Sequence, residues 1–297
     1  MQSAAASDAP SSRHILAIAN QKGGVGKTTT AVNLGAALAQ RGERVLVVDL
    51  DPQGNASTGL GIQGSRAPGS YALMLRSAAP SAALRSTALP SLRLLPADPD
   101  LAGAEIELVG VPGRERLLRD ALAEADFAGF GRVLIDCPPS LGLLTLNAFV
   151  AADAVLVPLQ CEFFALEGLS HLVRTIERVR ISLNPAIALE GILLTMLDRR
   201  NNLSDLVAAD ARSFFGAKVY DTVIPRNVRV SEAPSHGMPV VSYDPRSAGA
   251  LAYGQLAAEM QARGSAPAPQ QGPSPLEAQT ESGARGFRGV ETQSPSP

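Results

Sequence analysis

The sequence contains no tryptophan, only 2 cysteines and few aromatic residues, which make up 4% of the chain. Because single-stranded nucleic acids are bound largely by stacking bases on aromatic rings, a base-stacking surface is not expected. Cys137 and Cys161 form no C-x-x-C pair, and the 3 histidines are widely scattered. A disulfide framework or a metal cluster is therefore not expected, and a reducing cytoplasmic compartment is the default.

Long hydrophobic runs and an excess of one charge are also missing. No run approaches the length of a membrane span, and the N-terminus has no basic region followed by an apolar core, as a secretory signal would have. We therefore expect no membrane partner. The formal net charge of -2 excludes a globally basic nucleic-acid binder, although a basic patch on one face stays compatible with it.

Composition divides the chain into three parts. Residues 1–12 are rich in Ala and Ser, and residues 264–297 are rich in Pro, Gly, Ser and Gln, so both predict disordered tails. Residues 13–263 alternate short apolar runs with helical patterns, which predicts one α/β domain. Its fold class is a doubly wound, mostly parallel sheet with helices on both faces.

Each expected element is a short stretch of this domain. The expected strands are residues 15–19, 44–48, 92–96, 132–136, 154–159, 191–196 and 219–224, with a short extended piece at 240–241. The expected helices are residues 29–40, 71–75, 114–125, 166–183, 203–215 and 247–263.

A glycine-rich turn, NQKGGVGKTT at 20–29, lies between the first strand and the first helix. Strand, glycine loop and helix in this order are the context of a phosphate-binding loop, in which backbone N–H groups surround phosphate oxygens. Lys27 would contact the β- and γ-phosphates, and the Thr28 hydroxyl would ligate Mg²⁺. Gln21 stands where the usual G-x-x-x-x-G-K-[ST] pattern has its first glycine, and Lys22 is an additional cation.

Acidic residues follow two of the apolar strands. Asp136 ends the strand at 132–136 and either holds Mg²⁺ through water or caps the next turn. Asp49 and Asp51 either form a turn before Pro52 or place one carboxylate beside the γ-phosphate, where it would position the attacking water. Periodicity does not decide which of the two faces the phosphate.

Basic residues near three turns allow two interpretations each. Lys22 is either a solvated lysine or a cation that compensates the charge of a nucleotide held by a facing subunit, as an arginine finger does. Arg199 and Arg200 lie in a turn, and Arg226 and Arg229 flank a later loop. These arginines either increase solubility or contact DNA phosphates without reading sequence.

Five segments together resemble the ParA/Soj family of chromosome-partitioning ATPases, from about residue 13 to residue 260. They are KGGVGKTT at 22–29, DLDPQGN at 49–55, DCPPSLG at 136–142, QCEFFALEG at 160–168 and IPRNVRVSEAP at 224–234. They follow the family's motif order, and the two tails lie outside the match. The resemblance implies a P-loop fold of the deviant Walker A type and Mg-dependent ATP hydrolysis, with ATP and Mg²⁺ as cofactors.

The resemblance also implies a role for each matching residue. Lys22 would reach across an ATP-sandwich dimer to the partner's nucleotide, Lys27 would bind phosphate, and Asp51 would be the hydrolysis aspartate. Thr28 and Asp136 would hold Mg²⁺. The implied nucleotide contacts are Lys22, Gly23, Gly24, Val25, Gly26, Lys27, Thr28, Thr29, Pro225 and Asn227, the last two beside adenine. Arg200 and Arg229 match arginines that bind DNA non-specifically.

The implied partners are a second copy of the chain, bound when ATP is present, double-stranded DNA of the nucleoid, and a ParB-type centromere-binding protein. The implied location is cytoplasmic and nucleoid-associated. An ATPase that positions plasmids or protein cargo is the alternative, because it would share these residues. Membrane-bound relatives carry a C-terminal amphipathic helix, whose periodicity residues 264–297 lack. Relatives of the nitrogenase iron protein need cluster-ligating cysteines, which Cys137 and Cys161 do not match.

Overall fold

The computed structural model describes residues 13–63, 68–162, 165–198, 200 and 202–265. In this part of the chain, seven strands form one sheet in the order β3-β4-β2-β5-β1-β6-β7. All neighbouring strands are parallel except β3 and β4, which are antiparallel. The strands are β1 His14–Ile18, β2 Val45–Asp49, β3 Arg85–Ser86, β4 Leu92–Leu95, β5 Arg132–Asp136, β6 Ala154–Gln160 and β7 Ala188–Thr195.

The helices fill the connections between the strands. They are α1 Lys27–Gln40, α2 Asn55–Gly59, α3 Ser70–Met74, α4 Pro80–Ala83, α5 Ala104–Glu107, α6 Leu117–Leu122, α7 Leu143–Ala151, α8 Ala165–Ser182, α9 Asn202–Phe215, α10 Val228–Glu232, α11 Val240–Tyr243 and α12 Ala248–Ser265. Short 3₁₀ turns occur at Pro99–Gly103, Arg114–Arg116, Ala125–Phe127, Gly216–Lys218 and Ala233–His236. No described helix has the length and apolar character that crossing a membrane would need.

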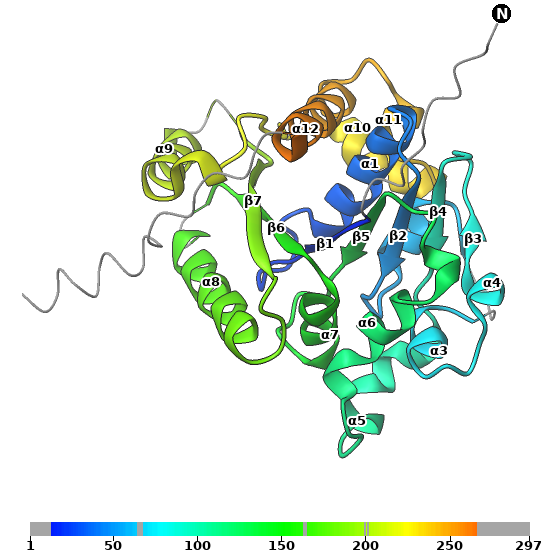
Figure 1. Cartoon of the computed structure of the whole chain (residues 1–297). Coiled ribbons are helices and arrows are strands. Elements are labelled where there is room, and N and C mark those ends of the chain that lie inside the picture. The colour runs from blue at the N-terminus through cyan, green and yellow to red at the C-terminus, as the bar shows by residue number, and fades with distance from the viewer. Residues whose placement is uncertain (1–12, 64–67, 163–164, 199, 201, 266–297) are drawn as a thin grey trace, which may run out of the picture.

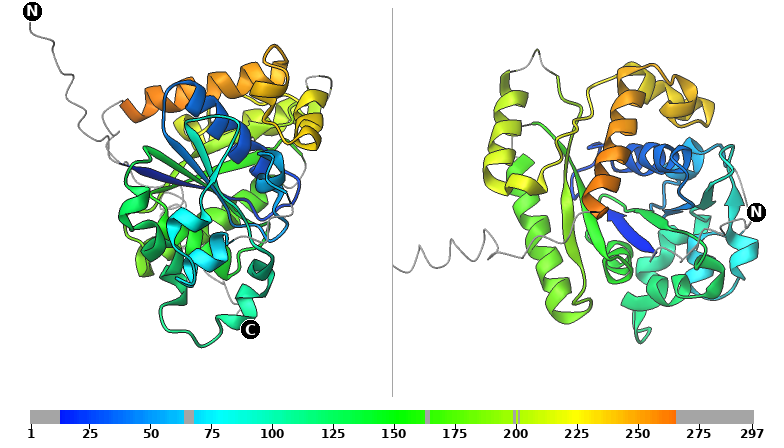
Figure 2. Two further views of the ribbon diagram at one scale, coloured as in Figure 1. Left: turned by 90° about the vertical axis from the view of Figure 1, so that its right-hand side faces the viewer. Right: turned by 45° about the horizontal axis from the view of Figure 1, so that its top comes forward.

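Two apolar clusters cover the two faces of the sheet. Alternate residues of β1 point to opposite faces, so Leu16 packs with α1 and α12, whereas Ala17 packs with α6, α7 and α8. Figure 1 shows α1 and α12 on one side of the sheet and α6 and α7 on the other, and the turned view repeats these layers (Figure 2). The predicted doubly wound sheet is therefore confirmed.

The position of β1 in the sheet indicates which edge of the sheet is suited to a ligand. β1 lies between β5 and β6, and the chain leaves β1 on one face for β2, on the far side of β5. Later connections lead to β6 and β7 on the opposite side of β1, so the direction in which strands are added reverses at β1. In open α/β sheets, ligands bind at the carboxyl ends of the strands where the strand order reverses. Ile18 and Asp136 are register partners here, as are Asp49 and Asp136. The glycine-rich turn and both strand-end aspartates therefore lie at one edge.

Two of the predicted extended segments are wrong. Residues 219–224 form no regular strand. The N–H groups of Tyr220 and Ile224 donate to β7 at 2.9 Å each, but those of Asp221 and Thr222 donate to the Glu259 carboxylate at 2.9 Å each, which interrupts the pairing. Residues 240–241 belong to helix α11. There the Val240 N–H donates to the side chain of Asn33 at 2.6 Å, and the chain turns after Pro239.

Other differences concern helices. Helix α7 is not predicted from the sequence, because residues on all sides of this helix are buried and its apolar pattern has no polar face. The helix expected at 114–125 is divided into a 3₁₀ turn and the shorter α6. α12 ends at Ser265, and the two expected tails otherwise lie outside the described residues, so the division into a domain and two tails stays a prediction.

Candidate functional site

The glycine-rich turn folds as a tight connection from β1 into α1. Gly24 and Gly26 have positive φ angles of 75° and 92°, which residues with a Cβ rarely adopt. Helix α1 begins directly at Lys27, with a bond from the Thr30 N–H to the Gly26 carbonyl at 2.9 Å. Among described residues, no side chain caps α1, and its first turn has no acidic residue. The helix N-terminus is therefore open to an external anion.

Contacts from neighbouring strands hold the turn in place. The Asn20 amide donates to the Pro158 carbonyl in β6 at 2.8 Å, and its oxygen accepts the Lys22 N–H at 3.0 Å. The Thr195 hydroxyl at the end of β7 donates to the carbonyl of the buried Val25 at 2.8 Å. Sequence patterns do not indicate Thr195, because no motif marks a contact between residues 170 positions apart.

Lys27 is buried, with only 6% of its surface exposed. Its ammonium donates to the Lys22 carbonyl at 3.1 Å, so the side chain curls back over the turn. Burial lowers the pKa of Lys27, and the nearby Asp136 carboxylate partly offsets this. A phosphate in the turn would supply the anion that a desolvated ammonium requires.

Asp136, at the end of β5, is completely buried, and neither of its carboxylate oxygens accepts a hydrogen bond of normal geometry from any described residue. Burial raises the pKa of Asp136 well above its usual range, and Asp49 raises it further, while the Thr28 hydroxyl and Lys27 act in the opposite direction. An unpartnered buried carboxylate facing a hydroxyl is a set of oxygen donors suited to Mg²⁺. These residues therefore fit the metal.

Asp49 and Asp51 have different surroundings. Asp49 is fully buried, and its oxygens accept the Ser57 hydroxyl at 2.7 Å, the Ser57 N–H at 2.8 Å and the Asp51 N–H at 3.3 Å. Burial raises the pKa of Asp49 to about 6, against the lowering effect of these hydrogen bonds. Asp51 accepts the Gln53 N–H at 3.0 Å and is 7% exposed. Asp49 thus organises the turn after β2, and Asp51 is the carboxylate with the freer oxygen.

The Lys22 side chain forms an ion pair with a residue far away in the sequence. Its ammonium pairs with the Glu162 carboxylate at 2.6 Å, and the two side chains are 48% and 47% exposed. The pairing places Lys22 at the surface beside the connection between β6 and α8. No sequence motif singles out Glu162 as its partner, because the two residues lie 140 positions apart.

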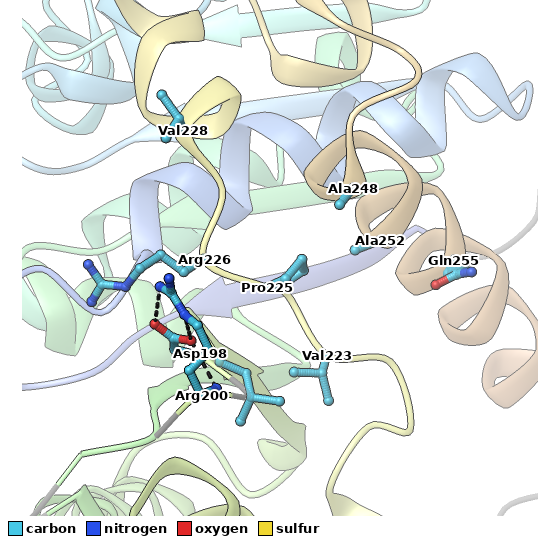
Figure 3. A pocket seen from close by; sticks show the side chains of 10 residues that line it. Asp198, Arg200, Val223, Pro225, Arg226, Val228, Ala248, Ala252 and Gln255 are labelled. Carbon is cyan, nitrogen blue, oxygen red and sulfur yellow. Dashed lines mark hydrogen bonds and ion pairs between the residues drawn. The ribbon is translucent and has the colours of Figure 1, made fainter. Parts of the chain in front are cut away.

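Pro225 and Asn227 lie in the connection that leads to α10. Pro225 bridges Leu197 beyond β7 and lines a pocket of about 580 Å³. Figure 3 shows Arg200 and Arg226 at one end of this pocket and Ala248 and Ala252 of α12 facing it from the other side. Asn227 does not line this pocket; its side chain caps α10 by accepting the Val230 N–H at 3.3 Å.

The two arginines expected to bind DNA are exposed but paired within the chain. Arg200 binds Asp198 through two side-chain hydrogen bonds of 2.9 and 2.8 Å, which lower the pKa of Asp198 to about 2. Arg229 pairs with Glu232 at 2.8 Å and lies 3.5 Å from Asp244. Arg199 lies outside the described residues.

Comparison with known proteins identifies the family. Residues 13–189 match the family model of an AAA domain. The chain is 61% identical over 251 residues to the chromosome partitioning protein ParA of Caulobacter vibrioides, covering 84% of this chain and 94% of that protein. It is 54% identical over 251 residues to the sporulation initiation inhibitor protein Soj of Bacillus subtilis, with 84% and 99% covered.

Solved structures share the architecture. A structure titled cobyrinic acid a,c-diamide synthase from Mycobacterium smegmatis, with bound ATP analog and magnesium, is 42% identical with a TM-score of 0.75, covering 86% of this chain and 96% of that chain. The septum site-determining protein MinD of Pyrococcus horikoshii, complexed with Mg-ADP, is 25% identical with a TM-score of 0.70, covering 85% and 98%. With the relatives above, these matches agree with the motif order of the sequence, and the chain belongs to the ParA/Soj family of P-loop chromosome-partitioning ATPases.

Proposed function

We propose that this chain is a Mg-dependent ATPase that drives chromosome segregation by cycling between a free state and an ATP-bound dimer on DNA. The observation that carries the proposal is the unpartnered, buried carboxylate of Asp136. It lies beside Thr28, in the first turn of α1, where the helix N-terminus is open. ATP supplies the phosphates for the turn. The solved M. smegmatis relative, with its ATP analog and magnesium, supports the same pair of ligands here.

In the proposed site, the N–H groups of residues 23–29 surround the β-phosphate, and Lys27 neutralises charge on the β- and γ-phosphates. Thr28 and Asp136 hold Mg²⁺, which when bound stabilises the negative charge that develops on the phosphates. Asp51 orients the attacking water. Most of the catalysis is then electrostatic positioning, since phosphoryl transfer needs little covalent chemistry from the protein. Pro225 and Asn227 border the adenine.

Lys22 completes the site of a second copy of the chain. Its ammonium lies on the surface, whereas the phosphate position of this chain is already served by Lys27. A cation offered from a facing subunit lowers the cost of bringing two nucleotides together at one interface. Nucleotide occupancy thereby controls dimerisation.

The surface that binds DNA contains Arg200 and Arg229. Both are exposed, on segments that flank the pocket beside Pro225. Contacts to phosphate give affinity without sequence preference, as binding along a nucleoid requires. A ParB-type partner stimulates hydrolysis and releases the protein from DNA. The names of the relatives, ParA and Soj, support this cycle.

The test is binding of the purified full chain to double-stranded DNA with ATP, with ADP and without nucleotide, each with and without a ParB-type protein. We expect binding with ATP only, and loss of binding with phosphate release when the partner is added. Light scattering of Lys22→Ala separates dimerisation from folding: ATP should no longer raise its mass, while its circular dichroism stays that of the wild type. Equal DNA affinity in all nucleotide states would refute the coupling.

A further inference from the structure

The Lys22–Glu162 pair ties the phosphate-binding turn to the chain between β6 and α8. Glu162 is held from several directions. One carboxylate oxygen accepts Lys22 at 2.6 Å, the other accepts the side-chain amide of Gln160, and the Glu162 N–H donates to the Gln160 carbonyl at 2.8 Å. The Glu162 carbonyl accepts the Ala165 N–H at 3.1 Å, where α8 begins. Glu162 is therefore hydrogen-bonded through its backbone and its second carboxylate oxygen independently of Lys22.

A second contact joins the same two segments. The Gln21 side-chain nitrogen lies 2.5 Å from Nδ1 of His171, one helical turn or more into α8. Gln21 and Lys22 are the two residues at which the turn departs from the usual P-loop pattern. Gln21 and Lys22 thus both contact residues that follow β6, namely His171 in α8 and Glu162.

The Lys22 ammonium can pair either with Glu162 of the same chain or with a nucleotide of a facing subunit, but not with both at once. In this structure it pairs with Glu162. The backbone of Lys22 is engaged separately, since its N–H donates to Asn20 at 3.0 Å and its carbonyl accepts Lys27 at 3.1 Å. The side chain can therefore move while the turn keeps its shape. A partner's phosphates, being more highly charged than one carboxylate, would take the ammonium only after the exposed pair opens.

We infer that Glu162 is a positioning residue that holds Lys22 within its own subunit and so raises the protein concentration at which the ATP dimer forms. The inference rests on the proposed ATP-dependent dimer. An exposed ion pair strengthens an equilibrium by about 1.4- to 5-fold, and a dimer opens two such pairs. Removing the pair should therefore tighten dimerisation by roughly 2- to 30-fold.

The experiment compares wild type with Glu162→Gln as full-length chains. Glutamine keeps the size and an oxygen for the Gln160 amide but removes the charge that attracts Lys22. The dimer dissociation constant is measured by analytical ultracentrifugation with Mg²⁺ and a non-hydrolysable ATP analogue, and nucleotide affinity is measured at protein concentrations where the chain is monomeric. We expect a dimer dissociation constant that is lower by about 2- to 30-fold and an unchanged nucleotide affinity.

Two controls make the result specific. Glu177→Gln removes a carboxylate that pairs with Arg180 at the same distance, 2.6 Å, within α8, and should leave dimerisation unchanged. Lys22→Ala with Glu162→Gln should dimerise no better than Lys22→Ala alone, since the effect requires Lys22. If the wild type dimerises and the dimer dissociation constant of Glu162→Gln is equal to or higher than that of the wild type, the inference is overturned, but the proposed function is not. Absence of any nucleotide-dependent dimer in wild type overturns the proposed function and the inference with it.

Discussion

Asp49 and Asp136 are register partners at the ends of the neighbouring strands β2 and β5, and both side chains are fully buried. The fold satisfies only one of them. Asp49 accepts three hydrogen bonds from Ser57 and Asp51, whereas Asp136 accepts none of normal geometry within the described residues. Two buried carboxylates side by side repel each other when both are charged, and Asp49 accordingly raises the pKa of Asp136 further, beyond the effect of burial.

The first prediction concerns the pH dependence of stability without nucleotide. The pKa of Asp49 is raised to about 6 and that of Asp136 well above its usual value. A carboxyl with a raised folded-state pKa contributes stability below its unfolded pKa of about 4 and loses it as pH rises through the folded pKa. The free energy of unfolding should therefore fall as pH rises from about 4 through 6 and beyond.

Replacing Asp136 tests this directly. Asp136→Asn should flatten the decline, because it removes a buried carboxyl whose pKa is raised well above its usual range. Urea unfolding across that pH range is the measurement. Asp120→Asn, at an exposed carboxylate paired with Arg119, is the control and should keep the wild-type slope. An Asp136→Asn profile as steep as wild type would contradict the assignment. The variant should also lack the stabilisation that Mg²⁺ adds to bound ATP.

The second prediction separates Asp51 from Asp49. Asp51→Ala removes one hydrogen bond, the one from Gln53, so it should remain folded, with a cost of about 1 kcal/mol. Its ATP hydrolysis should fall by at least about 100-fold, because no carboxylate then positions the attacking water. The variant should persist on DNA as an ATP dimer, detected by phosphate release and DNA co-sedimentation.

Asp49→Ala is the matched comparison. It removes three hydrogen bonds from the turn after β2 and should cost about 3 kcal/mol or more of stability. Normal turnover in a folded Asp51→Ala would reject the role given to Asp51, and equal stability of the two variants would reject the structural role given to Asp49.

The third prediction concerns Arg229. Arg229→Glu should weaken DNA binding by about tenfold or more at fixed salt, and the slope of log affinity against log salt should become shallower by about 0.9 for each phosphate that is no longer neutralised. The ATP dimer should form as in wild type. Arg180→Glu, a substitution of a paired arginine on α8, is the control. DNA affinity equal to wild type in Arg229→Glu, measured by fluorescence anisotropy, would exclude a role for this arginine in DNA binding.

The fourth prediction follows from the pairing of Arg229 with its own chain. Glu232 holds the guanidinium at 2.8 Å, and in the proposed DNA-bound state a phosphate would compete with this carboxylate. Glu232→Gln should therefore tighten DNA binding by about 2- to 5-fold. The same measurement in the Arg229→Glu background should show no such gain. Weaker binding by Glu232→Gln alone would mean that the carboxylate presents Arg229 to DNA instead of competing for it.

Local patterns predict six of the seven described strands, all but the two-residue β3. Short local patterns mark the glycine-rich turn, Lys27 and the strand-end aspartates. An Asp that directly follows an apolar strand is predicted to lie at the carboxyl edge of the sheet. The family resemblance, resting on motif order, is confirmed by the relatives. Roles of individual residues stay predictions until the variants above are measured.

The features that the sequence does not reveal depend on distant residues. Glu162 meets Lys22 across 140 positions and Thr195 meets Val25 across 170, and no periodicity records such pairs. Residues 219–224 have a strand-like pattern, but the Glu259 carboxylate accepts two of their N–H groups, those of Asp221 and Thr222, and so interrupts the pairing with β7. Asn227 is expected at the adenine, and its side chain also has a local task as the cap of α10.

The central place of β1 has a consequence for how the protein is made. β1 pairs with β5 and β6, at residues 132–136 and 154–160, and not with β2. During synthesis from the N-terminus, the strand that carries the phosphate-binding turn has no partner until nearly half of the chain has emerged. Pairing across such a separation is slow and comes late in folding. A nascent or truncated chain that lacks residues 132–160 therefore has neither neighbour of β1, the strand that leads into the glycine-rich turn.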